Sequence, residues 1–186
     1  MYNHCSLSVG RHLKMTSFYS GIGSRNTPKD VLLEMEKLAI SLELKGYCLR
    51  SGGADGADQA FERGVLNSKH IYLPWKNFCG NKSIRFPPKP KAFEMASEIH
   101  PNWNYLKHGA KLLHARNMHQ VLGDNLDIPS DFVLCWTPDG AESESQTSRT
   151  TGGTGSAIRL ADRIGIPVVN LFNKGWKDKL GDILNA

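Results

Sequence analysis

Apolar residues recur along the chain in two alternating patterns: short compact runs, and longer segments with an apolar residue at every third or fourth position. The short runs end at glycine, proline or polar residues, which is typical of buried strands. They lie at residues 16–20, 47–50, 70–73, 131–136 and 168–172. Helical spacing predicts helices between them, at residues 28–45, in the stretch that ends at Arg63, and at residues 92–99, 102–122 and 157–164.

The first helix has clear boundary signals. Thr27 precedes Pro28, so we expect Thr27 at the N-cap and Pro28 at the first helical position. Asp30 adds an acidic side chain to the first turn, and Gly46 ends the pattern. These signals predict a helix that joins the first two predicted strands.

The alternation of strand and helix predicts the fold class. Strands joined by helices pair in parallel through right-handed crossovers. We therefore expect an α/β fold: a single-domain, Rossmann-like, doubly wound sheet of about five mainly parallel strands with helices on both faces. The domain is expected to span residues 16–186, after an N-terminal arm or extension at residues 1–15; either Met1 or Met15 could be the natural start.

Three glycine-rich turns each follow a predicted strand. They are residues 21–25, 51–58 and 150–156, and the last opens a helix. Glycines let backbone N–H groups form a concave anion-binding nest, and the N-terminus of a helix adds partial positive charge. Because the first strand and the strand at 131–136 are neighbours in the common doubly wound order, the first and third turns should face one crevice, with the second beside them.

Individual side chains in these turns have alternative interpretations. Arg25 is a phosphate clamp or a solvated turn residue, and Asp55 and Asp58 bind ribose hydroxyls or cap the helix that follows. Gly153 is expected to have a positive φ and to lie beside the anion, so a valine there should block ligand binding.

Composition favours an anionic partner, because the chain of 186 residues has a net charge of +5. Residues 76–91 are strongly basic, and Trp75 and Phe86 accompany them, so this segment is either a solvated loop or a flap over a phosphate-bearing ligand. The polar residues 138–148 suggest a lid. No apolar run is long enough to span a membrane and no signal peptide is evident, so we expect a cytoplasmic protein.

Several cofactor classes are disfavoured. The glycine turns complete neither the dinucleotide fingerprint nor a Walker motif, so we expect no cofactor. His108, His114 and His119 are spaced around a helix rather than along one face, so we expect no metal site. The four cysteines show no metal-binding or disulfide pattern.

The turn motifs, together with Arg116-Asn117 and Gly152-Gly153-Thr154-Gly155, resemble the Rossmann-like SLOG superfamily, which joins DNA-processing protein A with the LOG-type phosphoribohydrolases. The chain looks most like its small, uncharacterised YspA-type branch, from about residue 18 to residue 171. The resemblance implies binding of a nucleotide or a nucleotide-derived phosphate ligand. It implies these ligand-binding residues: Gly21, Gly23, Ser24, Arg25, Ser51, Gly52, Gly53, Asp55, Asp58, Arg116, Asn117, Gly152, Gly153, Thr154, Gly155 and Ser156.

One departure bears on enzymatic activity. Arg116 matches the arginine of the LOG-type hydrolases, but Arg159 occupies the place of their glutamate, and cleavage of an N-glycosidic bond needs a carboxylate. The candidate carboxylates that could take the place of this glutamate are Asp55, Glu142 and Glu144.

Two functions therefore remain open. The first is a nucleotide-ligand binder that acts as a sensor or as a nucleotide N-glycoside hydrolase. The alternative is a single-stranded DNA-binding accessory protein that resembles DNA-processing protein A, with the basic segment as a contact to the strand. A homodimer is compatible with both.

Overall fold

The fold is described here from a computed structural model, which covers residues 17–186; the predicted arm at residues 1–15 and Thr16 lie outside the described residues. The predicted fold class is confirmed: one parallel sheet has the order β3-β2-β1-β4-β5. Its strands are β1 (Ser17–Gly21), β2 (Tyr47–Ser51), β3 (Lys69–Ile71), β4 (Phe132–Cys135) and β5 (Val168–Asn170).

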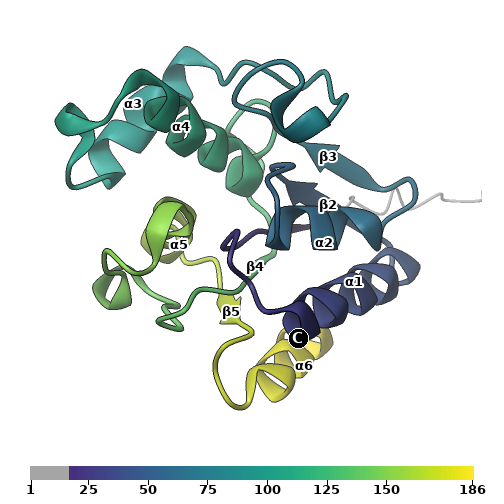
Figure 1. Cartoon of the computed structure of the whole chain (residues 1–186). Coiled ribbons are helices and arrows are strands. Elements are labelled where there is room, and N and C mark those ends of the chain that lie inside the picture. The colour runs from purple at the N-terminus through teal and green to yellow at the C-terminus, as the bar shows by residue number, and fades with distance from the viewer. Residues whose placement is uncertain (1–16) are drawn as a thin grey trace, which may run out of the picture.

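Six α-helices cover the two faces of this sheet, as Figure 1 shows. They are α1 (Lys29–Leu44), α2 (Ala57–Arg63), α3 (Pro90–Ile99), α4 (His108–Leu122), α5 (Gly155–Arg163) and α6 (Trp176–Asn185). Helices α1, α2 and α6 share one hydrophobic cluster, and α3, α4 and α5 share the other. Within residues 17–186, no helix is both long and apolar enough to cross a membrane.

The side chains of strand β4 pack alternately into the two hydrophobic clusters. Phe132 and Leu134 point into the cluster with α1, α2 and α6, while Val133 and Cys135 point into the cluster with α3, α4 and α5. This follows from the two-residue period of a strand, and all four side chains are fully buried. The continuous apolar run therefore predicts a central strand correctly.

Strands β1 and β2 turn polar side chains toward α4 and the loop that follows it. The Ser20 hydroxyl donates a hydrogen bond to the carbonyl of Gln120 at 2.8 Å. Arg50 is 2 % exposed and donates to the Ile128 carbonyl at 2.6 Å, while its guanidinium lies 3.8 Å from the centre of the Phe18 ring. Burial lowers the pKa of Arg50, yet an arginine stays protonated. These bonds fix the C-terminal part of α4 and the following loop against β1 and β2.

The structure corrects some predicted boundaries. Helix α4 begins at His108 rather than at residue 102, because Trp103–Tyr105 forms a separate 3-10 turn and Leu106 and Lys107 have extended backbone angles. Thr27 does not cap α1; its hydroxyl donates to the carbonyl of Ser24 instead, at 2.8 Å. Helix α6 was not predicted from the sequence.

Candidate functional site

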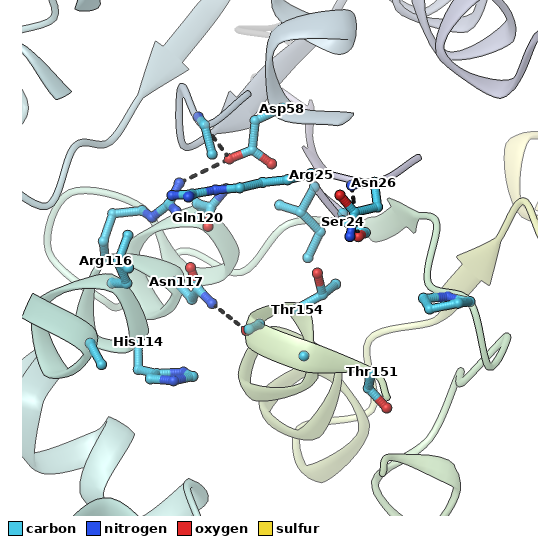
Figure 2. A pocket seen from close by; sticks show the side chains of 18 of the residues that line it. Ser24, Arg25, Asn26, Asp58, His114, Arg116, Asn117, Gln120, Thr151 and Thr154 are labelled. Carbon is cyan, nitrogen blue, oxygen red and sulfur yellow. Dashed lines mark hydrogen bonds and ion pairs between the residues drawn. The ribbon is translucent and has the colours of Figure 1, made fainter. Parts of the chain in front are cut away.

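A cleft of about 440 Å³ opens at the carboxyl ends of the central strands β1 and β4. The strand order reverses between these two strands, and ligands of open α/β sheets bind at such a switch point. The loops after β1 and β2, the segment before α5, and one face of α4 line the cleft (Figure 2). Its volume is in the usual range for a small-molecule ligand, roughly 300 to 1,000 Å³.

The first two glycine turns meet each other through their backbones. The N–H of Ala57 donates to the carbonyl of Ser24 at 3.3 Å. Gly56 has a φ of +85°, and a Cβ on it would lie 2.7 Å from the Ser24 oxygen. A Cβ on Gly23 would lie 2.8 Å from the Cβ of Ala57. These two glycines are therefore required by the packing of one loop on the other.

A buried ion pair joins the second turn to α4. Nη1 of Arg116 lies 3.0 Å from Oδ2 of Asp58, and both side chains are about 95 % buried. The guanidinium rests directly on Gly52, where a Cβ would lie only 1.0 Å from Nη1. Burial raises the pKa of the Asp58 carboxyl, while Arg116 and the N–H of Ala54 oppose this shift. Arg116 is thus held by the protein itself.

The third glycine turn is held by the same helix. Nδ2 of Asn117 donates to the carbonyl of Gly153 at 2.9 Å. The 3-10 turn Gly152–Thr154 leads directly into α5, whose first turn contains no acidic residue and no side-chain cap. The N–H of Gly155 donates to the Gly152 carbonyl, so the helical N-terminus begins in this 3-10 turn, which lines the cleft. Because the N-terminus of a helix carries partial positive charge, the turn is suited to an anion.

The expectation for Gly153 is corrected in one respect. The positive φ, +67°, belongs to Gly152, and Gly153 has no positive φ. A Cβ on Gly153 would meet no atom within 4 Å, because this residue borders the open cleft.

Arg25 lines the cleft and, unlike Arg116, can form an ion pair with a ligand. It is exposed, and within residues 17–186 it forms no ion pair. Its guanidinium carbon lies 5.9 Å from the centre of the Phe78 ring, as does that of Arg116, and its charge contributes to lowering the pKa of Arg116. Figure 2 shows the Arg25 side chain extending along the cleft toward Arg116.

The structure brings many of the predicted ligand-binding residues to this cleft. Those that line it are Gly23, Ser24, Arg25, Asp58, Arg116, Asn117, Gly152, Gly153 and Thr154.

The other predicted residues lie behind the lining or away from it. Gly21 packs on Phe61, and the Ser51 hydroxyl donates to the Gly21 carbonyl at 2.6 Å. The remaining members of this group, which also do not line the cleft, are Gly52, Gly53, Asp55, Gly155 and Ser156.

None of the three candidate catalytic carboxylates lines the cleft. Asp55 is exposed and accepts a hydrogen bond from Gln59 at 2.9 Å. Glu142 pairs with Lys179 at 2.7 Å, and Glu144 pairs with Arg163 at 2.6 Å. Within the described part of the chain, no three His, Cys, Asp or Glu side chains are grouped as metal ligands would be.

Sequence reasoning missed two polar side chains of α4 as part of the cleft, His114 and Gln120. Gln120 lies three positions after Asn117 and four after Arg116, on the same helical face, so the helical period could have identified it. Its Nε2 has no hydrogen-bond partner in residues 17–186. The segment before α5 adds Thr150 and Thr151 to the lining.

His114 is held in the neutral form. Its Nδ1 is hydrogen-bonded to the Ser156 hydroxyl, and its ring centre lies 4.3 Å from that of His100. Burial, together with the charges of His100, Arg116 and Arg159, lowers the pKa of His114 to about 4. At neutral pH this side chain therefore contributes no charge to the cleft.

This shift predicts a pH dependence of stability. The pKa of a histidine in the unfolded chain is near 6.5, whereas that of His114 in the folded protein is about 4. Between these two pH values the unfolded state binds a proton that the folded state does not, so the free energy of unfolding falls as the pH is lowered. Between pH 7 and 4.5 the wild type should lose about 2 kcal/mol more unfolding free energy than His114→Gln does. Urea unfolding of both proteins at the two pH values measures the difference, and equal losses would contradict the account.

The ion pair predicts a second effect on stability. Asp58→Ala should lower the free energy of unfolding by about 3 to 5 kcal/mol, because Arg116 is left buried without a counter-charge. Removing both charges, as Asp58→Ala with Arg116→Met, should cost clearly less than the sum of the single changes. Glu34→Ala breaks the exposed Lys177–Glu34 pair and serves as the control, with an effect below about 1 kcal/mol. Additive effects at positions 58 and 116 would show that the pair is not coupled.

Comparison with known proteins places the fold. No protein-family model and no curated protein matches the chain. Among solved structures, the chain is similar to DNA processing protein A from Helicobacter pylori, reported for its single-stranded DNA binding mode. The TM-score is 0.53 at 22 % sequence identity, over 92 % of this chain and 74 % of that one. The chain thus shares the Rossmann-like fold of that protein.

Proposed function

We propose that this protein binds single-stranded DNA, with one nucleotide of the strand in the cleft and its phosphate between Arg25 and the N-terminus of α5. The observation that carries this proposal is the pairing of charges around the cleft. Asp58 neutralises Arg116, whereas Arg25 and the uncapped end of α5 have no anionic partner among residues 17–186. Both are groups that bind phosphate.

The structural neighbour supports DNA as the source of that phosphate. DNA processing protein A from Helicobacter pylori binds single-stranded DNA, and its fold extends over 92 % of this chain. The net charge of +5 and the basic stretch at residues 76–91 suit a polymer of phosphates. A DNA-binding accessory role also agrees with the expected cytoplasmic location.

A free nucleotide or nucleotide-derived ligand is the second candidate, and the walls of the cleft favour it. The amide of Gln120 and the neutral ring of His114 border the cleft, as polar groups that could face a base or a sugar. This is the function that the resemblance to the LOG-type and YspA-type branch implies. Sensing fits this candidate better than hydrolysis does, because Asp55, Glu142 and Glu144 lie outside the cleft and Arg159 donates to the Thr147 hydroxyl at 2.8 Å.

Substitutions in the cleft test whether it binds the phosphate. Arg25→Ala should weaken binding of a fluorescent oligothymidylate by roughly 10- to 150-fold, the equivalent of about 1.5 to 3 kcal/mol for a hydrogen bond to a charged group. Gly153→Val should abolish binding without unfolding the protein, because its side chain would fill open cleft space. Gly181→Val, in α6, has the same free space but lies outside the cleft and is the matched control.

Salt titration separates the two candidates. A strand that contacts several phosphates should show a logarithmic affinity slope of about −0.7 per phosphate, and Arg25→Ala should reduce the slope by about one phosphate. A shallow slope, with thymidine monophosphate binding as tightly as the oligomer, would favour the free nucleotide. Unchanged oligomer affinity in both Arg25→Ala and Gly153→Val would rule out the cleft as the binding site.

A further inference from the structure

The loop after β3 carries an exposed tryptophan. Trp75 is 42 % exposed, although it packs edge-to-face on Phe78 with ring centres 5.0 Å apart. Phe78 itself is buried. A large aromatic side chain that keeps this much contact with solvent, while its buried neighbour holds it, presents a stable surface for another ring.

The loop that carries Trp75 is tightly built. The N–H of Phe78 donates to the Trp75 carbonyl at 3.3 Å, and the N–H of Gly80 donates to the Asn77 carbonyl at 3.0 Å. The Asn81 amide donates to both carboxylate oxygens of Glu62 in α2, at 2.9 and 3.1 Å. A side chain held in place before binding loses little conformational entropy when a ligand stacks on it.

Phe78 connects this surface to the cleft. The guanidinium of Arg25, which lines the cleft, lies 5.9 Å from the Phe78 ring on which Trp75 packs. Lys76 and Lys82 are exposed in the same loop, and neither forms an ion pair within residues 17–186. The loop that carries the exposed ring of Trp75 therefore also carries two exposed cations.

We infer that Trp75 is a stacking platform for an unpaired base of the same strand, one that neighbours the nucleotide in the cleft. This inference rests on the proposed function and adds a second contact to it. The occupant is single-stranded nucleic acid because an unpaired base offers a free π-face to the indole, and the phosphates beside it match Arg25, Lys76 and Lys82. Trp75 does not line the cleft, so a mononucleotide confined to the cleft should not stack on it.

Binding of two ligands to the full chain tests the inference. The ligands are a fluorescent oligothymidylate of about eight nucleotides, within the usual site size, and thymidine monophosphate. Trp75→Ala should weaken oligomer binding by roughly 5- to 150-fold and leave monophosphate binding unchanged. Trp75→Phe keeps an aromatic face and should bind the oligomer nearly as the wild type does. Trp75→Leu keeps apolar packing on Phe78 without a π-face and should resemble Trp75→Ala.

Tyr105→Ala is the matched control, because Tyr105 is 89 % exposed and does not line the cleft. The platform is overturned if Trp75→Ala or Trp75→Leu binds the oligomer as the wild type does, or if either weakens monophosphate binding as much as oligomer binding. It is equally overturned if Tyr105→Ala has the same effect as Trp75→Ala. If Trp75 matters for the oligomer while Arg25→Ala and Gly153→Val do not, the cleft assignment fails and the platform stands.

Discussion

The buried ion pair between Asp58 and Arg116 is the interaction on which the candidate site depends. It joins the start of α2 to the middle of α4 across 58 residues of sequence, and its guanidinium lies on the backbone of Gly52. A buried pair of this kind stabilises little by itself, because both charges lose their hydration. The pair instead fixes the position of α4 relative to the turn after β2, because separating the two elements would leave a buried charge without its partner.

The position of α4 determines what the cleft presents. Arg50 and Ser20 hold the C-terminal part of this helix on the sheet through the carbonyls of Val121 and Gln120, and Asn117 holds the turn before α5. With Arg116 neutralised by Asp58, the lining keeps two positive groups, Arg25 and the 3-10 turn Gly152–Thr154 that begins the N-terminus of α5. The same folding contacts therefore leave a site that is open to an anion.

The strands, most helices and the meeting of the glycine turns could be predicted from the sequence, because they follow from local patterns and from the general topology of parallel sheets. The partners of individual charges could not. Arg25 and Arg116 look equally suited to phosphate in the sequence, and only the fold shows that Arg116 already forms an ion pair with Asp58. The sequence also does not distinguish the roles of the glycines. Gly52 and Gly56 are required because a Cβ there would clash with protein atoms, whereas Gly153 borders open space. The start of α4 was missed because extended residues within a helical pattern leave no strong signal.

The central claim is that a strand occupies the cleft, and amide NMR of the labelled protein titrated with oligothymidylate tests it most directly. The account predicts that the largest shifts occur at the amides of Ser24, Arg25 and Asn26 and at those of Gly152, Gly153 and Thr154, which line the cleft from two sides. Shifts confined to residues 76–91, with these six amides unchanged, would contradict it.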